Sequence, residues 1–312
     1  MKMLRKTKPL LLPLLLCLLA LSTSTTAQKI TNDTECPPVE DIVYSPFKPW
    51  FHFYSGSNQL CWITAMCTLA PADEARKQQF GATALIMGLI PLTLKDIAWP
   101  ERRIALVSAP LPFAAAVIVR ALGLEPTVPS DLDATHVQRY MHWMRGMWFA
   151  NIGARGNGVW TTMRVSLSLV MLLLSYGALA AVEIYSKRSS LGCVYPVFAV
   201  TWCIAGVFPA VIHALFAMQR QRQLQQGKGA ASTGSISAVQ GADEAWPVQL
   251  AWGVYYIAGT LVFTSIMAVT VAELAVWVFV HVAVTAASKI FALYICLLLR
   301  SPGDDAVREA QD

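Results

Sequence analysis

The sequence predicts an all-α membrane protein, a multi-spanning transmembrane helical bundle that follows a cleaved signal peptide. Of its 312 residues, 55% are apolar and only 14% are charged, whereas soluble domains are about 25% charged. The apolar residues are gathered into runs long enough to cross a hydrocarbon core of about 30 Å. The formal net charge of +5 is small, and no basic domain stands out. We therefore expect membrane lipid as a partner and no nucleic acid.

The first 27 residues are typical of a secretory signal peptide. "MKMLRKTKPLLLPLLLCLLALSTSTTAQ" combines a basic start, an apolar run from Leu10 and small residues before Gln28. The run is shorter than the ~20 residues that span a bilayer, which favours cleavage over an uncleaved anchor. Residues 28–50 would then form an extracellular or lumenal tail. The sequon Asn32-Asp33-Thr34 predicts N-glycosylation at Asn32.

Long apolar runs predict the membrane-spanning helices of a transmembrane domain over residues 51–299. Residues 248–299 would be about 80 Å long as one helix, so we expect two helices with a break at Glu273. Residues 51–70 are apolar only in their second half, which suits either a span or an interfacial segment. With that segment included, the seven predicted spans are 51–70, 79–97, 104–120, 165–183, 191–218, 248–270 and 274–299.

The distribution of Lys and Arg decides the predicted orientation. If residues 51–70 cross the membrane, about twice as many basic residues lie inside as outside, as short cytoplasmic loops require. If they do not cross, every later loop changes side and the bias reverses. We therefore predict seven spans in the secretory or plasma membrane, with the tail outside and residues 300–312 as a cytoplasmic tail.

Two of the predicted cytoplasmic segments differ in character. Residues 219–247 are rich in Gln, Gly, Ser and Ala, which predicts a flexible loop able to bind a cytoplasmic protein partner. Residues 133–155 place Trp and Met on one helical face and Arg on the other. That pattern favours a helix on the membrane surface, and the alternative is a helix packed under the bundle.

The cysteines predict a disulfide and no metal site. Cys36, Cys61 and Cys193 would lie on or near the oxidising side, so we expect one disulfide among them. The apolar surroundings of Cys67, Cys203 and Cys296 predict small core residues. No CxxC pair or His/Cys spacing indicates a metal. We find no catalytic constellation and no cofactor motif, and therefore predict no enzyme activity.

One polar stripe stands out in the last predicted span. His281, Thr285, Ser288 and Lys289 recur at helical spacing on one face. Lys289 lies too deep to reach the interface easily, so we expect Glu183 or Glu273 as its partner. The stripe either fixes helix packing or forms a ligand, ion or proton site.

A resemblance is carried by "EARKQQFGATALIMGLIPLTLKDIAWPERR", Glu74 to Arg103. This segment resembles a group of uncharacterised multi-pass membrane proteins of filamentous fungi. The resemblance implies a fungal source and a multi-spanning helical fold, and it transfers no binding or catalytic residue. Its charged end predicts an outer hairpin, in which Pro100 ends a helix and Arg102 and Arg103 lie outside.

Three classes of function are consistent with these features. A receptor or sensor, our first expectation, would bind a ligand with its tail and outer loops. A transporter or channel would line a hydrated path with His281, Lys289 and Glu273. A scaffold would recruit lipid or protein through residues 133–155. The sequence names no ligand.

Overall fold

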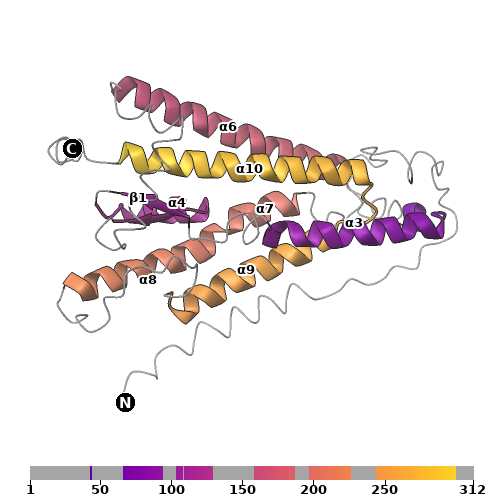
Figure 1. The fold of residues 1–312 in the computed structure, drawn as a ribbon, viewed down its shortest axis with the longest axis horizontal. Coiled ribbons are helices and arrows are strands. Elements are labelled where there is room, and N and C mark those ends of the chain that lie inside the picture. The colour runs from indigo at the N-terminus through magenta and orange to yellow at the C-terminus, as the bar shows by residue number, and fades with distance from the viewer. Residues whose placement is uncertain are drawn as a thin grey trace, which may run out of the picture. The chain divides into compact units, whose positions relative to one another are not determined.

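A computed structural model describes residues 43, 66–93, 103–107, 109–128, 158–186, 197–225 and 244–299 (Figure 1). This part of the chain is mostly helical. In order, its elements are α3 (Glu74–Leu92), β1 (Ile104–Leu106), α4 (Phe113–Ala121), β2 (Glu125–Thr127), α6 (Gly158–Tyr185), α7 (Phe198–Ala205), α8 (Val207–Gln225), α9 (Trp246–Thr264) and α10 (Val271–Leu298).

Three stretches of helix are long and apolar enough to cross a membrane: Thr162–Tyr185, Phe198–Gln223 and Val271–Leu298. α6 and α10 each have 28 residues, or about 42 Å of helix. Large apolar side chains are exposed along them, among them Leu173 and Leu174 on α6 at 62% and Phe279 on α10 at 73%. Faces of this kind suggest a membrane protein. The predicted apolar helices over 165–183 and 274–299 are confirmed, and 191–218 is confirmed from residue 198 onward.

The turn between the last two helices lies earlier than predicted. α9 ends at Thr264 and α10 begins at Val271, so the break is not at Glu273. Thr270 is the N-cap of α10, and the Glu273 carboxylate accepts from the Thr270 backbone N–H at 2.7 Å and from its hydroxyl at 2.9 Å. This capping box stabilises the start of the helix. Glu273 therefore marks the first turn of α10 rather than the loop.

α7 and α8 form one apolar stretch that is interrupted at Gly206. Pro209 has no N–H to donate to the carbonyl of residue 205, so the regular ladder cannot continue through this turn. At the interruption the Gly206 N–H donates to the carbonyl three residues back, that of Cys203, at 3.3 Å, and not to the carbonyl four residues back as in an α-helix. α8 starts at Val207. α8 then continues to Gln225, which corrects the predicted start of the flexible loop at residue 219. Its last turns are Gln, Arg and Leu, all good helix formers.

The predicted span over 104–120 is wrong. Residues 104–106 form strand β1, and the helix that follows, α4, has only nine residues with Pro112 as its N-cap. Nine residues reach about 14 Å and cannot cross a membrane. Pro110 and Pro112 disfavour helix in the residues before them. β1 and α4 are both apolar, and hydropathy does not distinguish a short apolar strand followed by a short helix from one long helix.

β1 and β2 pair in parallel, with Ile104 opposite Glu125 and Leu106 opposite Thr127. Parallel strands require a crossover connection, and α4 supplies it. The described chain is therefore not purely α-helical. Ala105 and Val107 pack with Val119 of α4 and with Ala292 and Cys296 near the C-terminus of α10. We call this end of the bundle the strand end.

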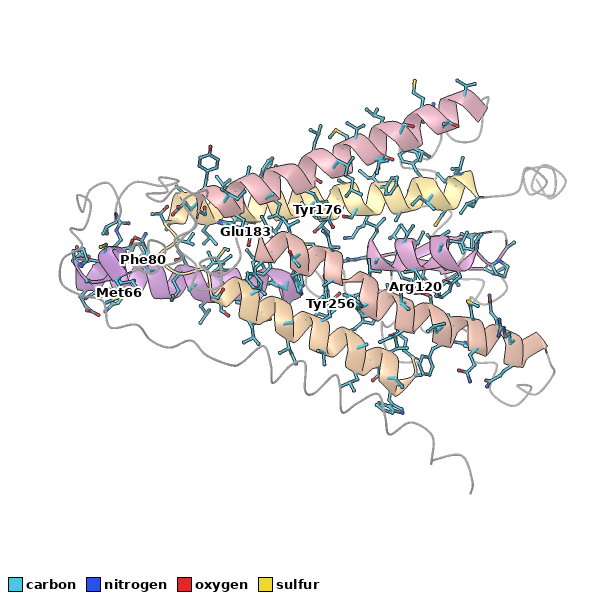
Figure 2. All side chains as sticks on the ribbon, turned by 180° about the vertical axis from the view of Figure 1, so that it is seen from behind. Met66, Phe80, Arg120, Tyr176, Glu183 and Tyr256 are labelled. Atoms are coloured by element: carbon cyan, nitrogen blue, oxygen red, sulfur yellow. The ribbon has the colours of Figure 1, made fainter. Side chains whose placement is uncertain are left out.

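The opposite end, here the turn end, surrounds residues 265–270. Phe80 on α3 packs there with Ala268, and the Thr83 hydroxyl donates to the Val269 carbonyl at 2.8 Å. Figure 2 shows Phe80 and Glu183 toward this end of the bundle and Arg120 toward the strand end. A cluster of fully buried apolar side chains fills the turn-end half: Met87, Leu179, Phe263 and Trp277 are its largest members.

The turn end also contains one residue of the predicted outer tail. Val43 packs in the same buried cluster as Ala72, Phe80 and Ala268. Residues 51–65, most of the predicted span over 51–70, lie outside the described residues, so this span stays a prediction.

The described cysteines divide differently from the expectation. Cys67, predicted to be a core cysteine, is in a disulfide bond whose partner lies outside the described residues. Cys203 and Cys296 are free thiols. The other predictions that fall outside the described residues are the signal peptide, the sequon at Asn32, the tail apart from Val43, the cysteines Cys36, Cys61 and Cys193, the segment 133–155, most of the loop 219–247 and the tail 300–312.

Candidate polar cavity

A cavity of about 180 Å³, here the central cavity, lies between the middle of the bundle and the strand end. All four residues of the predicted polar stripe line it: His281, Thr285, Ser288 and Lys289. α10 holds them on one face because they are separated by four, three and one residues. Ile90 and Val284 line the cavity and also belong to the apolar cluster of the turn-end half. The cavity therefore begins where that cluster ends.

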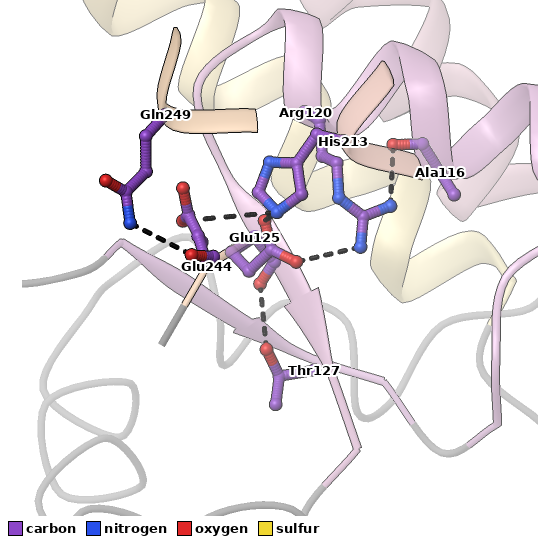
Figure 3. A network of polar contacts seen from close by, with 7 residues as sticks. All are labelled: Ala116, Arg120, Glu125, Thr127, His213, Glu244 and Gln249. Atoms are coloured by element: carbon purple, nitrogen blue, oxygen red, sulfur yellow. Dashed lines mark hydrogen bonds and ion pairs between the residues drawn. The ribbon is translucent and has the colours of Figure 1, made fainter. Parts of the chain in front are cut away.

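A polar network also lines this cavity: Arg120 of α4, Glu125 of β2, His213 of α8 and Glu244 just before α9 (Figure 3). Arg120 donates to the Glu125 carboxylate at 2.8 Å, and both side chains are largely buried, with 7% and 17% exposed. His213 Nε2 lies 3.5 Å from the other Glu125 oxygen and 4.0 Å from the Glu244 carboxylate. The His213 ring thus joins two carboxylates that are 119 positions apart in the sequence.

The backbone fixes these side chains in place. Glu125 is in register with Ile104, and its N–H donates to the Arg103 carbonyl at 2.8 Å. The Gln249 amide donates to the Glu244 carbonyl at 2.9 Å, which ties the segment before α9 to its first turn. Buried carboxylates and guanidinium groups require such partners, because an isolated buried charge is very costly.

A second cavity of about 340 Å³, here the end cavity, lies on the other side of the network. Arg120, Glu125, His213 and Glu244 line both cavities. The end cavity is otherwise lined by α4, β2 and the last turns of α8 up to Gln223, including Arg220. The polar network therefore stands between the middle of the bundle and the strand end.

Aromatic rings form another wall of the central cavity. Trp202 stacks on Tyr255 with ring centroids 4.7 Å apart, and its indole N–H donates to the Tyr255 carbonyl at 2.9 Å. Tyr256 and Trp252 extend this wall toward the strand end, with centroids 6.0 Å apart. Gly259 is required beneath it, because a Cβ at that position would lie 2.5 Å from the Trp202 ring.

His281 closes the inner end of the cavity. Its ring is buried and stacks against Trp277 at 5.6 Å. Nδ1 lies 2.8 Å from the Trp277 carbonyl oxygen, which can only accept, so Nδ1 carries the proton. In the neutral ring Nε2 is then an acceptor, and among the described residues it has no hydrogen-bond partner.

The two glutamates expected beside Lys289 lie at the turn end and do not line the cavity. Glu273 is 16 positions from Lys289 on the same helix, or about 24 Å, so it cannot pair with that lysine. Glu183 accepts from the N–H groups of Ala199 at 2.7 Å and Val200 at 3.4 Å, at the start of α7. Both carboxylates satisfy helix N-termini, where negative charge is stabilised. That expectation was wrong.

Arg103 was expected in an outer hairpin and instead lines the central cavity with Lys289. It directly precedes β1, so the strand carries it to the strand end. No pattern in the sequence groups Arg103, Arg120, Glu125, His213 and Glu244. The available signals were weak: a Pro-interrupted apolar run before Arg120, and one histidine in an apolar helix. In the described part of the chain, no group of three His, Cys, Asp or Glu side chains is placed to hold a metal ion.

The chain has no match among protein families, curated proteins or solved structures. The function must therefore be argued from the cavities themselves.

Proposed function

We propose that this chain is a membrane carrier that binds a small polar solute in the central cavity. One observation supports the proposal most directly: the α10 stripe and the network of Arg120, Glu125, His213 and Glu244 line the same cavity. Ionisable side chains are rare inside membrane bundles and are found mostly where they serve a solute or ion path. A stripe that only fixed packing would face apolar or small residues of a neighbouring helix.

The proposed topology has five crossings: α3, α6, the α7–α8 pair, α9 and α10. α9 has no charged residue over its 19 positions, and it packs along α3. Close packing of Gly88 on α3 against Thr264 and Thr260 on α9 supports the pairing of these two helices. The β1–α4–β2 unit does not cross in this arrangement.

Three independent features support an extracellular or lumenal turn end. Cys67 is in a disulfide there, which favours an oxidising compartment. Val43, which follows the predicted signal peptide, packs there. Basic side chains in the described residues are fewer there, with Arg76 and Lys77 against Arg103, Arg120, Arg164, Arg220 and Arg222 at the strand end. The positive-inside rule then makes the strand end cytoplasmic.

This orientation opens the carrier toward the cytoplasm. The turn-end half is filled by the apolar cluster around Trp277 and Phe263, whereas both cavities are in the strand-end half. Solute would enter from the strand end, past the polar network, and movement of the apolar cluster would be needed for release on the other side. The receptor interpretation depends on the tail and outer loops, which lie almost entirely outside the described residues, and stays a prediction.

Cysteine accessibility tests the carrier. Thr285→Cys is introduced with Cys203 and Cys296 replaced by serine, and an impermeant methanethiosulfonate is added to either face of oriented vesicles. We expect fast modification from the strand end and slower, measurable modification from the turn end, because a carrier alternates between the two. Val282→Cys, on the exposed face of α10, is the unreactive control. Modification from one face only would reject a carrier in favour of a receptor-like pocket.

The topology has its own test. A glycosylation cassette is inserted between Ala70 and Pro71, both exposed at the turn end, and separately within residues 226–243. Five crossings predict glycosylation of the first and not of the second. Glycosylation of the second site, or its absence at the first, would overturn the orientation.

A further inference from the structure

We infer that the solute of the central cavity is a small uncharged polyol of the size of glycerol, which donates one hydroxyl to Nε2 of His281. This inference names the solute class of the proposed carrier and rests on that function for movement across the membrane. Binding itself is argued from two unpartnered atoms, the volume of the cavity and its walls.

A few buried side-chain atoms in the described residues have no hydrogen-bond partner: Arg120 Nε, Ser186 Oγ, Trp277 Nε1 and His281 Nε2. Buried polar groups are nearly always hydrogen-bonded, so each such atom requires an explanation. Ser186 and Trp277 line neither cavity, whereas Arg120 and His281 both line the central cavity. A molecule in that cavity can therefore supply the partner that the chain does not.

The unpartnered nitrogen of His281 accepts a hydrogen bond. Phe263 and Trp277 contact the ring, with centroids 4.8 and 5.6 Å away. A charge in such apolar surroundings would be very costly, so the ring is neutral. Its proton is on Nδ1, which donates to the Trp277 carbonyl. Nε2 then requires an O–H or N–H donor, and an anion without a proton cannot provide one.

The unpartnered nitrogen of Arg120 donates a hydrogen bond. The two terminal nitrogens of its guanidinium donate to the Glu125 carboxylate at 2.8 Å and to the Ala116 carbonyl at 3.4 Å, and Nε–H is left without an acceptor. An ammonium group cannot accept this hydrogen bond. A hydroxyl both donates and accepts, so a hydroxyl compound is suited to both unpartnered atoms.

The charged side chains of the lining do not require a charged solute. The four members of the polar network interact with one another. Arg103 and Lys289 also have interactions of their own. An uncharged solute leaves these interactions in place, whereas a buried ion requires a charged partner for itself. Hydrogen bonding rather than charge therefore selects the solute.

Volume limits the size of the polyol. A cavity of about 150 Å³ accommodates benzene, and the central cavity has about 180 Å³. Glycerol has as many non-hydrogen atoms as benzene and therefore fits. A sugar phosphate, a nucleotide or a lipid headgroup with its chains is too large.

The walls of the cavity suit a hydroxyl compound as well. Thr285 lies one turn along α10 from His281, and Ser288 follows on the same face. Each of these hydroxyls can donate and accept, so they can bind the remaining hydroxyls of a polyol. The stacked pair of Trp202 and Tyr255 offers an apolar surface to its carbon skeleton.

Nitrogen NMR of the unaltered full-length chain tests the inference. The chain is labelled with nitrogen-15 in its histidines, purified in detergent and titrated with glycerol. We expect the Nε2 signal of His281 to change and to saturate. The fully methylated ether of glycerol cannot donate a hydrogen bond and should cause no saturable change. Absence of saturation with glycerol, or an equal response to the ether, would overturn the inference.

A matched pair of variants locates the site. Protection of Thr285→Cys by glycerol is measured with the thiol reagent, with Cys203 and Cys296 replaced by serine. His281→Asn keeps a donor for the Trp277 carbonyl and removes the outer acceptor. It should raise the half-protecting concentration by about three- to tenfold, the range for one lost hydrogen bond. His281→Gln places an amide oxygen near the position of Nε2 and should restore most of the protection.

Two comparisons complete this experiment. Lys77→Cys, exposed at the turn end, is the control and should not be protected by glycerol. Urea offers N–H donors in place of hydroxyls, and stronger protection by urea than by glycerol would reject a polyol in favour of an amide. Unchanged protection in a folded His281→Asn protein would place glycerol elsewhere and reject the site.

The two proposals fail separately. If glycerol binds at His281 but Thr285→Cys is modified from one face only, the solute class stands and the carrier is rejected. If Thr285→Cys is reactive from both faces and glycerol does not bind, the carrier stands and the solute class is rejected.

Discussion

The two halves of α10 show the same helix in two opposite environments. From Val271 to Val284 it is packed against Phe263, Met87 and Leu179, with Trp277 fully buried among them. From Thr285 to Leu298 it borders the central cavity and the β1–α4–β2 unit. The first half is filled by apolar side chains, and the second contains the cavities. A rigid half of this kind can hold one wall of a binding site while the other half admits solute.

Acidic side chains show the same contrast. At the turn end, Glu183 and Glu273 accept from backbone N–H groups at helix starts. Those donors cannot move without unwinding a helix. At the strand end, Glu125 and Glu244 meet the side chains of Arg120 and His213. Side-chain partners can exchange for a solute, so only the second pair of carboxylates is suited to binding and release.

The largest expected effect on stability is in the turn-end half, which is filled by apolar side chains. Trp277→Ala removes a fully buried side chain and should lower the free energy of unfolding by about 3–5 kcal/mol through lost burial and a new cavity. Phe279→Ala, two residues away and 73% exposed, is the control and should change stability little in detergent or lipid. Thermal unfolding of both variants measures the difference. Equal melting temperatures would show that the turn-end half is not the packed one.

Removal of Arg120, the arginine of the polar network, should have the next largest effect on stability. Arg120→Met leaves the Glu125 carboxylate without its 2.8 Å donor, and we expect a loss of about 1.5–3 kcal/mol, typical of a hydrogen bond to a charged group. The double variant Arg120→Met with Glu125→Gln removes both charges and should recover part of the loss. Chemical denaturation of the single and double variants checks the coupling. A double variant with the summed loss would show that the two side chains do not interact.

Two glycines on α9 test the packing of the aromatic wall of the central cavity. Gly259→Ala places a methyl 2.5 Å from the Trp202 ring, and we expect a loss of about 1–3 kcal/mol of stability, because the aromatic wall must shift. Gly253→Ala has no atom within 4 Å and should stabilise the helix by up to about 1 kcal/mol. Melting temperatures that move in the same direction would contradict the close packing of Trp202 on Gly259.

The smallest expected effect concerns the cap of α10. Thr270→Ala removes the hydroxyl that bonds to Glu273, at a cost of about 0.5–2 kcal/mol. Modification of Thr285→Cys from the strand end should be unchanged, because the cap lies at the turn end. Thr201→Ala, on an exposed face of α7, is a same-sized control. If Thr270→Ala slowed that modification, the two halves would not be independent.

The proposed topology counts neither residues 51–70 nor residues 104–120 as a crossing. Residues 104–120 contain a strand and a helix of only nine residues, and Pro110 and Pro112 were the available warning against that span. Residues 51–70 are left out in the proposal because Val43 and Ala72 pack in one cluster. Seven crossings less two are five, an odd number, so both termini keep their predicted sides.

The sequence by itself determined the apolar helices and the face of α10 that carries His281, Thr285, Ser288 and Lys289. Both depend on periodicity and on residue type within one segment, and a helix of fixed pitch converts these directly into a face. Only the tertiary structure decided what that face meets. Arg103, Arg120, Glu125, His213 and Glu244 come from five separate segments, and their assembly depends on a parallel strand pair and on helix packing. Contacts of that kind are made between segments and leave no pattern within any one of them.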